Sequence, residues 1–200
     1  LRAAIGKERL SGFLTPSIRQ GKDGLDLSLP YYFNIATNQD LTITPRYIEE
    51  RGNGLGLSYR YLGNTNEGEI SLFGLSKDRK YKQETGKKSS RWRGSWSQSS
   101  NFENKIFSEI KYEDASDEFY FRDVNDDLIG NTRKDYLQRN VNIWWKTPKI
   151  KLGLSLKESQ SLNPFSLEDY KSVPLISLSA FKKRNDLLFI FSSNYGVFEQ

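Results

Sequence analysis

The sequence predicts an all-β chain folded as an antiparallel meander. Its strongest signal is an alternation of apolar and polar residues with a period of two. The alternation is most regular over residues 150–157, where Ile or Leu alternates with Lys, Gly or Ser. A strand points successive side chains to opposite faces, so such a segment has one apolar and one polar face. Apolar stripes at helical spacing are nowhere as strong, which excludes a helical fold.

The spacing of turn-forming residues supports the meander. Short turns are predicted at 37–40, 63–68, 98–103, 146–149 and 182–186, and longer or more polar connections at 20–24, 49–54, 77–90, 112–135 and 157–173. Short and long connections alternate, and every second connection of a meander lies at the same end of the sheet. Outer-membrane β-barrels have this asymmetry, with short turns on one side of the membrane and long loops on the other. We therefore expect an outer-membrane β-barrel.

About eleven strands are predicted between these turns, with lengths close to the roughly 9–11 residues of a tilted membrane strand. In chain order they are 10–19, 25–36, 41–49, 54–62, 69–77, 89–97, 104–113, 135–146, 149–158, 173–182 and 186–196. Their clearest apolar faces are Leu25, Leu27 and Leu29; Leu41 and Ile43; Leu55, Leu57, Tyr59 and Tyr61; Trp92, Gly94 and Trp96; Ile106, Ile110 and Tyr112; and Val141, Ile143 and Trp145.

A soluble β-sandwich is the main alternative, because its strands also alternate. The nearly sequential hairpins argue against it, as does the charge on the polar face of successive strands. The 27 aromatic residues also gather toward strand ends, as at 31–33 and 144–145. Membrane barrels carry such girdles at both interfaces.

Composition excludes several functions. The longest apolar run, 187–191, is far shorter than the roughly 20 residues of a membrane helix, and no secretory signal opens the sequence. The chain has no Cys and no His, which removes disulfides, cysteine zinc sites, thiolate nucleophiles and Ser-His arrangements from this stretch. We therefore expect no catalytic residue, cofactor or metal site, and the net charge of +5 is only a mild bias toward anions. The missing Met leads us to expect a piece of a longer chain.

Two motifs invite a ligand and fit it poorly. The glycine-rich stretch 51–56 has neither the phosphate-loop nor the dinucleotide spacing, so a hairpin is the better interpretation. The acidic connection starts like a calcium loop at Asp123, but Leu128 and Lys134 occupy the positions that require Gly and Glu. A solvated external loop explains it better, with incidental cation binding as the alternative.

Basic residues on the polar faces could line a lumen that handles anions. They are Arg91, Arg93, Lys105, Lys111, Arg139 and Lys151. Ordinary solvation of a wet lumen explains them equally well.

Two prolines fall inside the first two predicted strands. Pro16 and Pro30 cannot donate to a ladder, so each marks a bulge or a weak pairing. From the residues alone, two tolerated bulges are the simpler interpretation.

Several blocks in the first third of the chain resemble the start of the barrel domain of the LptD family, the lipopolysaccharide-assembly proteins of the Gram-negative outer membrane, also called organic solvent tolerance proteins. The blocks are 11–17 (SGFLTPS), 29–36 (LPYYFNIA), 38–47 (NQDLTITPRY), 51–52 (RG) and 60–62 (RYL). The resemblance is specific over residues 8–62 and looser beyond, where 90–92 (SRW) still fits.

The resemblance implies a role in transport rather than catalysis. Members of this family have a very large barrel behind a periplasmic jellyroll, plugged by the lipoprotein LptE. Lipopolysaccharide reaches the barrel over a periplasmic protein bridge and enters the outer membrane through a lateral gate between the first and last strands. Pro16 and Pro30 match the prolines proposed to weaken that gate. Residues 1–9 would then be a jellyroll tail or linker, and residues 10–200, with about eleven strands, the N-terminal arc of that large outer-membrane β-barrel.

Rival functions remain. A porin-like channel would conduct small solutes without a partner. An outer-membrane hydrolase would need a His from outside this stretch, and a soluble carbohydrate-binding sandwich would be monomeric without detergent. No nucleic-acid partner is expected.

Overall fold

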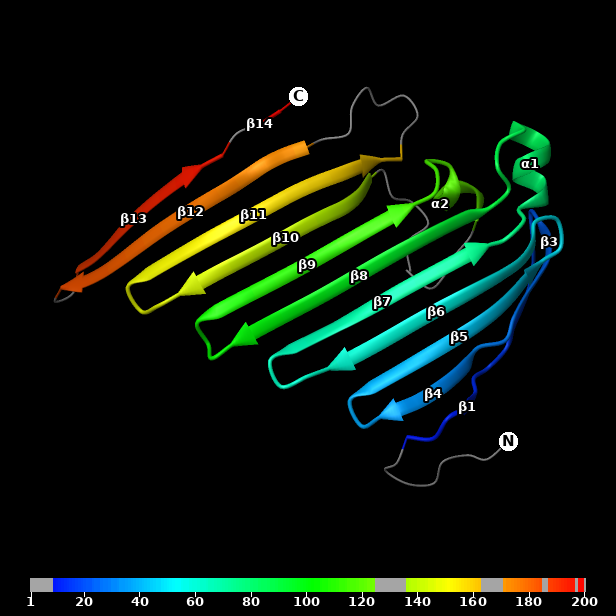
Figure 1. Ribbon diagram of the computed structural model, residues 1–200, viewed down its shortest axis with the longest axis horizontal. Helices are drawn as coiled ribbons and strands as arrows, with labels where there is room; N and C mark the ends of the chain where they lie inside the picture. The colour runs from blue at the N-terminus through cyan, green and yellow to red at the C-terminus, as the bar shows by residue number, and fades with distance from the viewer. Residues whose placement is uncertain (1–8, 125–135, 163–170, 185–186, 197, 200) are drawn as a thin grey trace. The chain divides into compact units, whose positions relative to one another are not determined.

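A computed structural model of the chain confirms the all-β prediction (Figure 1). It describes residues 9–124, 136–162, 171–184, 187–196 and 198–199. The strands are β1 (Gly12–Phe13), β2 (Ser17–Gly21), β3 (Gly24–Ser28), β4 (Tyr31–Ala36), β5 (Gln39–Ile48), β6 (Gly52–Leu62), β7 (Asn66–Leu75), β8 (Arg91–Phe102), β9 (Ile106–Ala115), β10 (Tyr136–Lys146), β11 (Ile150–Ser161), β12 (Lys171–Arg184), β13 (Leu187–Tyr195) and β14 (Phe198–Glu199). The proposed boundary at residue 9 borders residues that lie outside the described ones, so it stays a prediction.

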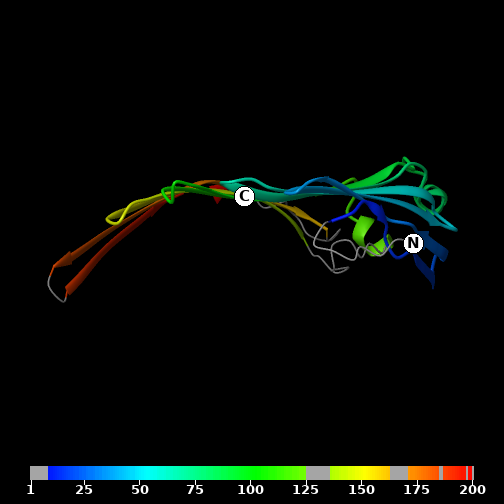
Figure 2. The ribbon, with the colours of Figure 1, turned by 90° about the horizontal axis from the view of Figure 1, so that it is seen from below.

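The described strands form one antiparallel sheet in which neighbours in space are neighbours in sequence. The main path runs β1-β4-β5-β6-β7-β8-β9-β10-β11-β12-β13, while β2 pairs with β3, β3 also pairs with β5, and β14 pairs with β12. Figure 2 shows the same strands turned by 90°. Among the described residues no second sheet faces this one, so the sandwich alternative finds no support.

The first two predicted strands are each interrupted. The predicted strand 10–19 is in fact β1 followed by the start of β2. The predicted strand 25–36 is in fact β3, except for its first residue, followed by the whole of β4. Pro16 and Pro30 lie in the gaps, not inside strands. The prediction of two continuous strands was therefore wrong, because a proline has no N–H to give to the ladder and fixes φ.

Two connections expected to be longer are in fact tight turns. β2 and β3 are joined through Lys22 and Asp23, and β5 and β6 through residues 49–51. Gly24 (φ 79°) and Gly52 (φ 122°) supply the positive φ that these turns need, which a side chain would strain. The alternation of short and long connections therefore does not hold in the first part of the chain.

Two short helices lie in the longer connections, and the sequence analysis expected neither. The first, α1 (Arg79–Thr85), follows β7, and the second, α2 (Tyr120–Asp123), follows β9. The carboxylate of Asp78 caps α1 by accepting from the Tyr81 N–H, and Gly86 ends it in the left-handed conformation at φ 68°. Within the described residues, neither helix is long or apolar enough to cross a membrane.

The chain divides into two compact units. The first comprises Leu1–Leu62, Glu69–Ser95 and Ala115–Tyr120, and the second comprises Gly63–Gly68, Trp96–Asp114 and Phe121–Gln200. In each unit the two faces of the sheet differ.

In the first unit one face is covered and the other is bare. Phe73 (2% exposed) and Leu75 (0%) lie on the covered face, whereas Leu72 (44%) and Trp92 (45%) lie on the opposite one. In the second unit Ile143, Leu152 and Leu154 are likewise exposed on one face of β10 and β11. The alternation predicted the faces correctly, and the apolar face is largely uncovered.

Candidate functional site

The prolines weaken the pairing of the first hairpin at one level of the sheet. The Leu14 N–H donates to the Pro30 carbonyl at 2.9 Å, but Pro30 has no N–H to return a bond to Leu14. Pairing resumes with Ser17 opposite Ser28, so Thr15 and Pro16 together face Leu29 alone. Two residues against one make a β-bulge. On the other side of the bulge, strand β1 is short: only Gly12 and Phe13 pair with β4, opposite Tyr32 and Tyr31.

A third proline, Pro45, lies at the same level on the next strand. The Leu29 N–H donates to the Pro45 carbonyl at 3.1 Å, and again no bond can be returned. In an antiparallel ladder such opposed residues ordinarily exchange two bonds. Pro45 was overlooked in the sequence, although it stands inside the predicted strand 41–49; only the register could align it with Leu29.

A buried group of charged side chains connects the turns at the other end of this hairpin. We call it the arginine network, and its members are Asp23, Arg51, Asp78, Lys80, Arg91 and Asp117. All six belong to the first unit. They come from the β2–β3 turn, the β5–β6 turn, the α1 connection, the start of β8 and the connection after β9.

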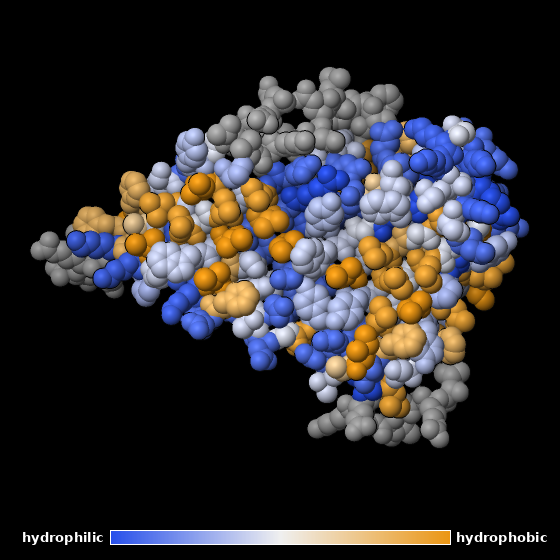
Figure 3. Space-filling model, in the orientation of Figure 1, coloured by the Kyte–Doolittle hydropathy of each residue, from blue (hydrophilic) through white to orange (hydrophobic). Residues whose placement is uncertain are grey.

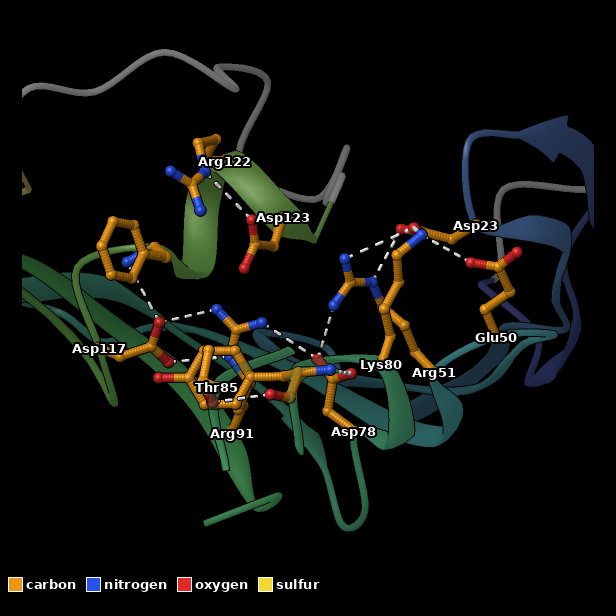
Figure 4. A network of polar contacts seen from close by, with 12 residues as sticks. Asp23, Glu50, Arg51, Asp78, Lys80, Thr85, Arg91, Asp117, Arg122 and Asp123 are labelled. Carbon is orange, nitrogen blue, oxygen red and sulfur yellow. Dashed lines mark hydrogen bonds and ion pairs between the residues drawn. The ribbon is translucent and has the colours of Figure 1, made fainter. Parts of the chain in front are cut away.

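Arg51 and Arg91 share one carboxylate (Figure 4). Asp78 is fully buried and accepts from Arg51 Nη1 at 2.8 Å and from Arg91 Nη1 at 3.0 Å. Arg51 also reaches Asp23 at 2.7 Å, and Arg91 holds Asp117 through two bonds of 2.7 and 2.9 Å. Such paired, charge-assisted bonds are the strong and geometrically specific kind.

Aromatic rings complete the surroundings of Arg91. Its guanidinium lies 4.0 Å from the centroid of the Tyr81 ring and 5.5 Å from that of Tyr120. Both tyrosines are buried. Cation–π contacts of this kind gain strength when they are shielded from water.

The network alters the ionisation of the Asp23 carboxylate. Burial acts to raise its pKa, but the hydrogen bonds from Arg51 and Lys80 outweigh burial, so the pKa is lowered overall. For Arg51, burial acts to lower the pKa, while the bonds to Asp23 and Asp78 raise it overall. Asp23 and Arg51 are therefore both held in their charged forms, as the partners of a stable ion pair.

The predicted anion-contacting residues do not come together in one place. Arg91 and Arg93 are each 1% exposed on the covered face of the first unit, and the charge of Arg91 is balanced by Asp78 and Asp117. Lys105 lies in the short turn between β8 and β9, exposed beside Glu103. Lys111 and Lys151 are exposed on the polar face of the second unit, where Lys151 lies 5.6 Å from the Trp144 ring.

Arg139 does not share that polar face. It pairs in register with Tyr112 and Glu158, and the register continues without interruption to Val141 and Ile143, which lie on the same side. Arg139 is half-buried there, within 3.1 Å of Asp114 and Glu158. The expectation of a polar-face position was wrong for this residue, because the strict alternation of β10 places every odd-numbered side chain on the apolar face.

No metal centre is found among the residues that the structure describes, since they contain no group of three potential ligands. Most of the suggested calcium loop, from residue 125 onward, lies outside those residues. Nearby carboxylates have other partners, since Asp117 binds Arg91 and Asp123 lies 3.2 Å from Arg122.

Comparison with known proteins places this arrangement in a family. A family model described as LptD, LPS transport system D, matches residues 89–200. This is the part for which the sequence resemblance was looser. The LPS-assembly protein LptD of Pseudomonas putida strain GB-1 is 33% identical over 177 residues, which is 88% of this chain and 19% of that protein.

Two further relatives have the same name. The protein of Pseudomonas putida strain F1 is 32% identical over 177 residues, and that of Pseudomonas entomophila strain L48 is 31% identical over 179 residues. Each alignment covers 88% of this chain and 19% of the relative. The chain therefore spans about a fifth of the length of the curated relatives it matches, and it belongs to the LptD family.

Proposed function

We propose that this chain forms part of the outer-membrane β-barrel of a lipopolysaccharide-assembly protein, and that it serves transport rather than catalysis. One observation carries the proposal: a sequential antiparallel meander, in a member of the LptD family, leaves its apolar face uncovered. Soluble proteins rarely expose so much continuous apolar surface. A bilayer would cover it.

The dimensions of the apolar face support a membrane position. On β5 it extends from Leu41 to Tyr47, which at about 3.3 Å per residue is roughly 20 Å, close to the apolar band of about 25 Å on outer-membrane barrels. Aromatic rings pack near its short-turn end, where the Tyr31 and Phe33 centroids lie 4.6 Å apart. Tyr47 and Trp92, both exposed, lie toward the other end.

The proline level supports a lateral gate at Pro16 and Pro30. A lipid that leaves a barrel sideways must pass between strands, which requires an edge whose backbone pairing is weak. Here the first strand is interrupted by a bulge, and the pairs Leu14/Pro30 and Leu29/Pro45 each lack one bond. The arginine network holds the opposite end of the same hairpin through Asp23.

The proposed partners follow from the family. Lipopolysaccharide is the cargo, an LptE-like lipoprotein plugs the lumen, and periplasmic bridge proteins deliver the cargo through a domain preceding this stretch. The relatives' own name, LPS-assembly protein, supports the first of these. Lys111 and Lys151, on the polar face, are the candidates for contact with anionic groups inside the lumen.

The test replaces the two proposed gate prolines with residues that can pair. Full-length protein carrying Pro16→Ala and Pro30→Ala replaces the wild-type copy in cells, and newly made lipopolysaccharide is counted at the cell surface. We expect delivery to slow, because the new N–H at position 30 can return the missing bond to Leu14, worth roughly 0.5–1.5 kcal/mol, and the replacement of Pro16 removes the fixed φ that holds the bulge. Pro148→Ala, in the short turn between β10 and β11, is the matched control and should deliver normally.

Unchanged delivery by the double variant would contradict the gate while leaving the assembly function standing. A different measurement addresses the porin alternative. If the reconstituted protein conducted small ions freely with the plug present, a general channel would be the better description.

A further inference from the structure

The connection between β7 and β8, residues 76–90, separates its charges into a buried set and an exposed set. It contains six basic and two acidic side chains. Asp78 is fully buried in the arginine network, and Lys80 is held by Asp23 at 2.9 Å and by Glu50 at 2.6 Å. The exposed cations are Lys77, Arg79, Lys82, Lys87 and Lys88.

Three of these cations form no ion pair with a described residue, although the exposed Glu84 lies in the same connection. Among the described residues, no carboxylate forms an ion pair with Lys82, Lys87 or Lys88. The acidic side chains of the adjacent turn are already engaged, because Glu50 binds Lys80 and Glu49 accepts from the Leu25 N–H at 2.7 Å. Glu84 offsets only one of the five exposed cations, so the segment presents an excess of positive charge.

This charge is carried on an ordered backbone. The Asp78 N–H donates to the Ser89 carbonyl at 2.7 Å, which joins the two ends of the connection. Between them α1 is capped at both ends, and Tyr81 packs under Arg91. A ligand that binds here has little chain to order, which favours affinity.

The connection that carries these cations joins two strands whose apolar side chains lie on the bare face. Leu72 precedes the connection on β7 and Trp92 follows it on β8, and a side chain at Gly94 would meet both of them. Figure 3 shows hydrophilic residues gathered over the α1 region at the upper right, beside the apolar residues of the strands. Tryptophan prefers the headgroup level of a bilayer, so the connection that leads directly into Trp92 would bring its lysines to the level of lipid phosphates.

We propose that the α1 connection binds the phosphate groups of anionic lipids in the leaflet it borders, through Lys82, Lys87 and Lys88. The inference rests on the proposed membrane function. An apolar surface next to ordered cations suits a molecule with acyl chains and a phosphate. Free phosphate would contact the cations but not the apolar side chains. Lysines near a membrane surface each add appreciably to the binding of anionic lipid.

The experiment uses the full-length protein with its lipoprotein partner in nanodiscs of phosphatidylcholine doped with phosphatidic acid. Native mass spectrometry counts the phosphatidic acid retained by each complex. The variant Lys82→Gln, Lys87→Gln, Lys88→Gln should retain it at least about tenfold more weakly than wild type. The control variant Lys146→Gln, Lys149→Gln, Lys182→Gln removes three exposed lysines at the opposite ends of strands and should behave as wild type.

Other results would contradict either the lipid-binding proposal or the proposed function. Equal retention by the two variants would overturn the proposal, as would displacement of the lipid by excess inorganic phosphate. Delivery of lipopolysaccharide by the wild-type protein is measured in parallel, because its absence would refute the proposed function itself. Resistance of each variant to a protease confirms that it has folded.

Discussion

The first hairpin and the β10–β11 hairpin have the same sequence alternation and are held together in different ways. β10 and β11 pair without interruption from Tyr136 opposite Ser161 to Lys146 opposite Lys151. The first hairpin is divided into pieces at its prolines, and its far end is tied to the rest of its unit by the buried arginine network. Backbone bonds hold one hairpin, and side chains contribute much of the hold on the other.

The ion pairs of the two regions differ in how deeply they are buried. Asp78 is fully buried between two guanidinium groups, whereas Asp114 beside Arg139 has a side chain that is 24% exposed. Breaking a fully buried pair leaves an uncompensated charge, whereas breaking a partly exposed pair costs less because water can reach the group that is left. The difference predicts which changes each hairpin can tolerate.

The largest effect is expected from Asp78→Asn. The buried Arg51 and Arg91 lose the carboxylate that they share, so we expect the free energy of unfolding of the first unit to fall by about 3–5 kcal/mol. Urea unfolding of the full-length protein, followed by tryptophan fluorescence, measures the change. A loss below 1 kcal/mol would mean that the network does not hold this end of the hairpin.

A proline placed in the intact ladder should reproduce the weakness of the first hairpin. Val141→Pro removes an N–H from a strand with neighbours on both sides, which should destabilise the second unit by roughly 1–3 kcal/mol. Hydrogen exchange at the amides of β9 and β11 is the sensitive measurement. Slow exchange there after the substitution would show that backbone pairing is not what holds this hairpin.

Acid should loosen the first hairpin before the second. The folded-state pKa of Asp23 is lowered from 3.8, so its stabilising contribution is complete above that ordinary value and is lost as pH falls through the lower one. We expect exchange at β2 and β3 to accelerate below about pH 4, the ordinary range of the carboxyl. Asp23→Asn should remove this acid dependence, and an acid response that survives in it must come from another group.

The smallest effect is expected from Asp114→Asn, which leaves the half-buried Arg139 with Glu158 and Gln160. A change of about 1 kcal/mol or less in unfolding is expected. The measurement is the same urea titration, and a loss as large as that of Asp78→Asn would erase the contrast between the two regions.

Sequence reasoning captured the parts of the fold that depend on local pattern. β10 and β11 lie within a few residues of their predicted ranges, because their alternation is regular and their turn is short. It failed at the first two strands, where alternation continues through residues whose backbone cannot pair. The short helix α1 had visible signals in Asp78 and Gly86, but no amphipathic stripe drew attention to them.

The arginine network was beyond sequence reasoning for a different reason. Arg91 appeared as one of several cations, and its partners Asp78 and Asp117 lie in two different connections. Only the register of the sheet brings them together. The alignment of Pro45 with Leu29 depends on the same information.

The tryptophans are distributed so that the chain carries its own optical reporters. Trp92, Trp96 and Trp145 are exposed on apolar faces, whereas Trp144 points to the polar side and lies against Gly153. Quenchers dissolved in acyl chains would therefore dim three of the four indoles, and a water-borne quencher would reach mainly the fourth. Emission spectra can thus follow the entry of this segment into a bilayer without any added label.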